Sequence, residues 1–194
     1  MDWSLVVGAP FDVGPAFSQR AGLQRGETPL ADKSSFTTEE WTLLLESPML
    51  AGMAITAADP SGLWGLLKES FASGSALAKA MTDPGSSPLV KALATDFSTT
   101  EARSAARDGL KAKLANSKPG EVKTKSIETL RQVSAVLGAK APADAAAFKS
   151  WLRQISQATA EAASEGGGLL GIGGVKVSEA EKATLTEIDS ALGV

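Results

Sequence analysis

Three segments of the chain share one helix-start signal, a Ser or Thr followed three residues later by Glu. The pairs are Thr37 and Glu40, Ser98 and Glu101, and Ser178 and Glu181. In such a capping box each side chain accepts a hydrogen bond from the backbone at the other end of the first turn. Apolar residues follow each signal at three- and four-residue spacing, and strand signals are nearly absent. The sequence therefore predicts an all-α fold.

Further boundaries divide the chain into a compact bundle of about six to eight helices. Ser47-Pro48 and Ser87-Pro88 each combine a cap residue with proline at the first helical position, and Pro119 opens another helix. Gly138 stands where that helix is expected to stop. The segment from Pro48 to Ala58 is apolar on every face, which indicates the buried centre of the bundle.

Residues 1–36 show no sustained period, and Gly and Pro recur among them. We expect an extended, irregular N-terminal arm over 1–36, followed by a helical domain over 37–194. The arm contains several large apolar residues, namely Trp3, Leu5, Val6, Val7, Phe11 and Phe17. Because apolar side chains gain free energy when they leave water, we expect the arm to lie across the helical body or across a partner.

Histidine, cysteine and tyrosine are all absent from the 194 residues. This excludes Cys or His nucleophiles, a His general base and zinc sites of the Cys/His type. No paired acid and base, or nucleophile and base, can be named among the remaining residues, so we do not expect an enzyme.

The chain has no secretory signal pattern at its N-terminus, and it cannot form disulfides. Its longest central uncharged run, Ser47–Ala58, has 12 residues, whereas a membrane-spanning helix needs about 20. We therefore expect a cytoplasmic protein without a membrane span.

Acidic residues gather where helices meet turns. Asp59 stands in a tight turn with Glu69 on the helix that follows, and acidic residues recur around the glycine-rich loop before the last helix. Carboxylates that converge at such junctions can bind Ca²⁺ or Mg²⁺, which prefer oxygen ligands. The alternative is that these residues cap helices and interact with the helix dipole.

The segments AADPSGLWGLLKE and AASEGG…VKVSEAEKATLTEI resemble the helical-hairpin signature of the TerB-like (tellurite-resistance) family. The resemblance covers about a quarter of the chain. It implies a bundle built from two helical hairpins, a stress-related role and metal binding by acidic residues. The positions that it implies are Asp59, Glu69, Glu165, Glu179 and Glu181.

Charge is distributed unevenly along the chain. Residues 101–140 hold nine Lys or Arg and four acids, a net charge of +5, whereas the rest of the chain carries −8. Arg103, Arg107 and Lys111 share one helix face, which could bind an acidic protein, a phosphate-bearing ligand or an anionic surface, or simply be solvated. The pI of about 5.1 and the lack of interleaved aromatic residues argue against nucleic acid.

The sequence thus favours a non-enzymatic helical protein-interaction or scaffold protein with a protein partner and possible homo-oligomers. The alternative is a small-ligand or divalent-metal sensing module that uses the acidic helix-turn junctions. Carboxylates that converge in space would favour the sensing module, whereas exposed apolar residues in the arm would favour the interaction protein.

Overall fold

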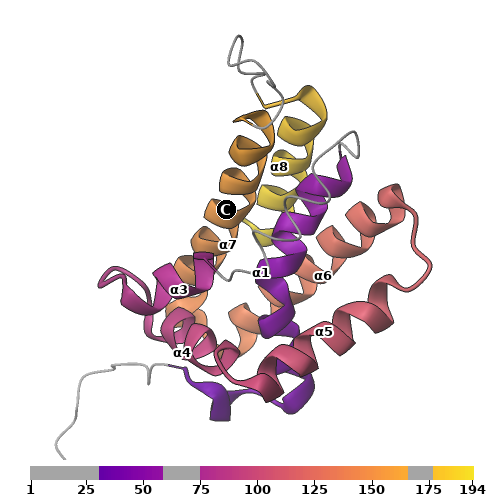
Figure 1. The fold of residues 1–194 in the computed structure, drawn as a ribbon. Coiled ribbons are helices and arrows are strands. Elements are labelled where there is room, and N and C mark those ends of the chain that lie inside the picture. Colours follow the sequence, from indigo (N-terminus) through magenta and orange to yellow (C-terminus); the bar gives the residue numbers. More distant parts are fainter. Residues whose placement is uncertain (1–30, 59–74, 166–176) are drawn as a thin grey trace, which may run out of the picture.

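The computed structural model describes residues 31–58, 75–165 and 177–194, and these form an all-α bundle without a strand (Figure 1). Seven α-helices and one short 3-10 helix make up the described parts. Their bounds are η1 Lys33–Ser35, α1 Thr38–Ala58, α3 Ser75–Thr82, α4 Pro88–Phe97, α5 Thr100–Leu114, α6 Pro119–Lys140, α7 Pro142–Glu165 and α8 Glu179–Leu192. The predicted fold class is confirmed.

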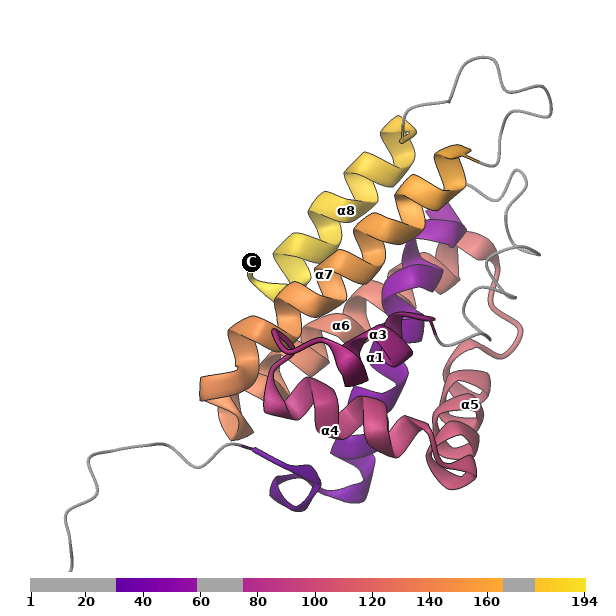
Figure 2. The same cartoon turned by 60° about the vertical axis from the view of Figure 1, so that its left-hand side comes forward.

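Helix α1 is the centre of the bundle and packs against α4, α5, α6, α7 and α8. Helices α7 and α8 lie side by side along α1, and α4 and α5 lie beside the N-terminal part of α1 (Figures 1 and 2). By length and composition α1 could cross a membrane, but 72% of its apolar window is buried inside the protein. A core helix of a soluble protein has this character, and the apolar centre predicted over Pro48–Ala58 is confirmed.

The predicted helix start at Ser47-Pro48 is wrong, because α1 runs through Pro48 without a break. Proline has no backbone N–H, so the Leu44 carbonyl loses the partner that an ordinary residue at position 48 would supply. The Ser47 hydroxyl donates to that carbonyl at 2.7 Å instead. Ser47 therefore replaces a missing hydrogen bond inside a continuous helix and does not cap a new helix.

Two of the three capping boxes are confirmed. Thr37 and Glu40 exchange hydrogen bonds of 2.7 and 3.2 Å, and Ser178 and Glu181 do the same at the start of α8. The third is wrong, because Ser98 has helical backbone angles and ends α4. Thr99 is extended, as a cap must be, and its hydroxyl accepts from the Ala102 N–H.

Proline rather than glycine sets the end of α6. The helix passes through Gly138, the expected stop, and continues to Lys140. Ala141 then leaves the helical region, as the residue before Pro142 is expected to do, because the proline ring clashes with a helical backbone at that position.

Residues 31–36, the end of the predicted arm, lie against the helical body. Ala31 is buried and its N–H donates to the buried carboxylate of Asp144 in the first turn of α7. The Phe36 ring packs 5.7 Å from the Trp41 ring, as the staple positions around a capping box predict. The apolar arm residues from Trp3 to Phe17 lie outside the described residues.

Candidate functional site

The acidic residues that could hold a divalent ion are only partly within the described chain. Glu181 is buried, and its carboxylate accepts from both the backbone N–H and the hydroxyl of Ser178 at 2.9 Å. Glu179 is exposed and pairs with Lys182 at 2.6 Å. Both residues therefore have the capping and first-turn contacts that the alternative interpretation expects.

The other three acidic positions have no described side chain. Asp59 and Glu69 lie outside the described residues, and Glu165 is the last residue of α7. Within the described ranges no three acidic side chains gather as ligands for one ion. A Ca²⁺ or Mg²⁺ site built from all five residues therefore stays a prediction.

The basic residues predicted to share a helix face do so on α5. Arg103, Arg107 and Lys111 are all exposed, whereas Ala102 and Ala106 are buried against the body. The Arg103 guanidinium donates to the Ser98 carbonyl at 2.6 Å, which holds it beside the start of the helix. Arg107 and Lys111 contact no acidic or hydrogen-bonding partner among the residues the structure describes. Their charge therefore faces solvent.

An ion pair between a buried acid and an exposed lysine joins α5 to the centre of the bundle. Glu46 of α1 is fully buried, and Lys113 Nζ donates to its two carboxylate oxygens at 2.9 and 2.7 Å. Gly109 makes room for this carboxylate, because a Cβ at that position would overlap Glu46 Oε1. A buried charge is costly without a partner, so Lys113 must stay in place and α5 with it.

Sequence reasoning did not identify this Glu46–Lys113 pair. Two signals for it exist in hindsight, an acid inside the apolar run LLLESPML and a glycine one helical turn before Lys113. Neither signal predicts that these two residues pair, because the two helices are separated by more than forty residues.

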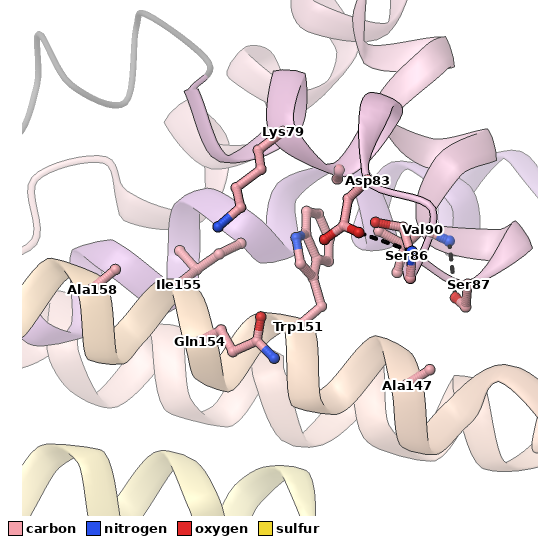
Figure 3. Close-up of a pocket in the computed structure, with 12 residues that line it drawn as sticks. Lys79, Asp83, Ser86, Ser87, Val90, Ala147, Trp151, Gln154, Ile155 and Ala158 are labelled. Carbon is pink, nitrogen blue, oxygen red and sulfur yellow. Dashed lines mark hydrogen bonds between the residues drawn. The ribbon is translucent and has the colours of Figure 1, made fainter.

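A second feature that the sequence did not reveal is a groove between the α3–α4 hairpin and α7, with a volume of about 450 Å³. Trp151 of α7 is half-buried and rises toward α3, with Lys79 on one side of its ring and Asp83 on the other (Figure 3). The Trp151 ring packs edge to face against the Phe148 ring, with 5.4 Å between the two ring centroids. Trp151 thus packs against Phe148 and also presents a face to this groove.

The walls and rim of the groove differ in polarity. The apolar wall is formed by buried Ala80, Val90 and Ile155. Lys79, Asp83 and Gln154 are exposed and border it. Asp83 Oδ1 accepts from the Gly85 N–H at 2.8 Å, which fixes the turn between α3 and α4. An apolar interior with a few polar groups is typical of ligand-binding sites.

The described parts of the chain form an all-helical bundle with a central buried helix, a solvated basic face on α5 and a groove beside Trp151. The chain matches no protein-family profile, no curated protein and no solved structure. The resemblance to the TerB-like family stays a prediction from the two quoted segments.

Proposed function

We propose that this chain is a non-enzymatic, cytoplasmic interaction or scaffold protein, and that the basic face of α5 binds an acidic protein partner. The basic face consists of Arg103, Arg107 and Lys111. The observation that carries the proposal is the exposure of all three on a helix that is itself rigidly held. The TerB-like resemblance supports a stress-related role for the interaction.

Charge complementarity selects the kind of partner. Residues 101–140, which form α5 and α6, carry +5 against a remainder of −8, so the field of the molecule attracts an acidic surface to the side of these two helices. Two half-buried leucines, Leu110 and Leu114, lie on the same helix and pack against the core. A protein partner can use both the charges and these apolar atoms, whereas a simple anion uses the charges only.

Rigid presentation strengthens the proposal. The Lys113–Glu46 pair and the close approach at Gly109 hold α5 on α1. Side chains on a fixed helix lose less freedom on binding than side chains on a loop, which favours affinity.

The test compares Arg107→Glu with Arg131→Glu. Both arginines are exposed, and the two substitutions change the net charge equally, but Arg131 lies on α6. Photo-crosslinking in native cells from position 100, an exposed and uncharged position in the first turn of α5, followed by mass spectrometry, identifies the protein at the basic face. Affinity of the purified pair is then measured at low and high salt.

Arg107→Glu is expected to weaken this complex by about fivefold or more at low salt, with less effect at high salt. Arg131→Glu is expected to leave it unchanged. Equal weakening by the two variants would mean that total charge alone matters, and crosslinks to neutral or basic proteins only would contradict an acidic partner.

A further inference from the structure

The groove between α3, α4 and α7 contains two hydrogen-bond donors that face a common space. Lys79 Nζ extends from α3 toward α7, and the nitrogen edge of the Trp151 indole is turned to the Lys79 side (Figure 3). Neither group has a hydrogen-bond partner in the described part of the chain. An ammonium and an indole N–H are donors only, so what satisfies both is an acceptor, and the charge of Lys79 favours an anion.

The negative charge at the groove restricts where an anion can lie. Asp83 borders the opposite side of the Trp151 ring, and its Oδ1 is already used by the Gly85 N–H. Like charges repel, so an anionic group is directed to the Lys79 side of the ring and away from Asp83.

The apolar wall determines the rest of the ligand. Ala80, Val90 and Ile155 present hydrocarbon to the groove, and the Trp151 ring offers a flat surface on which another ring can stack. The volume of about 450 Å³ lies within the usual range for a small-molecule site, about 300–1,000 Å³. A ligand with an apolar ring and one anionic group can contact the apolar wall and the Trp151 ring with its ring and accept hydrogen bonds with its anionic group.

We infer that this groove is a binding site for a small carboxylate with an apolar, planar body. The carboxylate accepts from Lys79 Nζ and from the Trp151 indole N–H, and the body lies against the Trp151 ring on the side of Ile155. The site is separate from the basic face of α5, and the inference does not depend on the proposed function.

The probe is 2-naphthoate, with 2-naphthamide as a neutral control of nearly equal shape. The full chain labelled with ¹⁵N shows one indole N–H signal for each of its four tryptophans, and Trp151→Phe assigns the signal of Trp151. Naphthoate is expected to move that signal in a saturable way, and naphthamide is expected to bind about tenfold more weakly because it lacks the charge.

Two variants test the individual contacts. Lys79→Met keeps most of the unbranched side chain but removes its charge, and it is expected to weaken naphthoate binding about tenfold without affecting naphthamide. Asp83→Asn retains an oxygen for the Gly85 N–H while removing the repulsion, so it is expected to bind naphthoate at least as tightly as the wild type.

Three results would overturn the inference. The first is a Trp151 signal that millimolar naphthoate does not move. The second is equal affinity for naphthoate and naphthamide, which would show that the groove recognises only the ring. The third is unchanged naphthoate affinity in Lys79→Met, which would place the anion elsewhere.

Discussion

Asp96 shows how a single side chain joins three elements of this protein. Its carboxylate accepts from the Trp41 indole N–H at 2.7 Å and from Lys33 Nζ at 2.9 Å, so α4 is tied to α1 and to η1. Partial burial raises the pKa of Asp96, but the hydrogen bonds from Trp41 and Lys33 outweigh it and hold the pKa below its ordinary value. The charged form is therefore the one that stabilises the fold.

A lowered pKa has a definite consequence for stability against pH. The contribution of Asp96 is fully present above its ordinary pKa of about 3.9 and is lost as the pH falls through the lower pKa of the folded state. Asp96→Asn keeps an acceptor for the indole N–H but loses the attraction to Lys33. We expect this variant to be less stable by about 1 kcal/mol at pH 7 and at pH 5.

Urea unfolding at pH 7, 5 and 3 measures the free-energy difference between the wild type and Asp96→Asn. The difference is expected to shrink at pH 3. A difference that grows as the pH falls would contradict the lowered pKa.

At the scale of elements, helix α1 depends on the side chain of Ser47. Pro48 is buried within α1, where a missing hydrogen bond costs most, and the Ser47 hydroxyl occupies the place of the missing N–H. This substitution of side chain for backbone explains why the helix is continuous where the sequence indicates a boundary.

A double-mutant cycle isolates this contact. Ser47→Ala in the wild type leaves the buried Leu44 carbonyl without a donor and is expected to cost about 1–3 kcal/mol. In a Pro48→Ala background the restored N–H can donate to Leu44, so the same change is expected to cost less than half as much. The free energy of unfolding in urea is the measurement for all four proteins, and equal losses in the two backgrounds would show that the hydroxyl does not replace the N–H.

Local signals in the sequence predict most of this fold. Thr37, Ser87-Pro88, Pro119 and Ser178 each start a helix as expected, because a cap depends on residues within one turn. Three predictions are wrong. The Ser47 hydroxyl replaces the missing N–H at Pro48, Thr99 rather than Ser98 caps α5, and Pro142 rather than Gly138 ends α6. The basic face of α5 follows from four-residue spacing alone.

The groove is beyond such reasoning. Its two sides, the α3–α4 hairpin and α7, are far apart in the sequence, and nothing local to Lys79 or Trp151 indicates that they face one space. The same holds for Glu46 and Lys113. Contacts between distant helices are set by the packing of the whole bundle, which no single segment encodes.

At the scale of the whole molecule, residues 31–36 connect several helices of the bundle. Ala31 contacts α7 through Asp144, Lys33 contacts α4 through Asp96, and Phe36 packs on α1. Three helices that are not consecutive in the sequence are thereby joined by six residues.

Two truncations separate the contribution of residues 31–36 from that of the rest of the predicted arm. Removal of residues 1–36 is expected to lower the melting temperature by several degrees relative to removal of residues 1–30, because it leaves the buried Asp144 carboxylate without the Ala31 N–H. Differential scanning calorimetry gives the comparison. Equal melting temperatures would mean that residues 31–36 add nothing to the bundle.

The truncation at residue 30 also tests the predicted docking of the arm. If the apolar residues between Trp3 and Phe17 lie on the helices or on a second copy, this truncation should lower the melting temperature or the mass found by sizing chromatography. No change in either would reject docking within the chain or between copies.

The central position of α1 has a consequence for synthesis on the ribosome. This apolar helix is made early, but the helices that cover it, α6, α7 and α8, are encoded in the second half of the chain. At about 5–20 residues per second, the interval from the end of α1 to the end of α8 is on the order of ten seconds. During that time α4, α5 and α6 cover α1 first, and the surface of α1 that α7 and α8 bury stays exposed on the nascent chain until the last helix emerges.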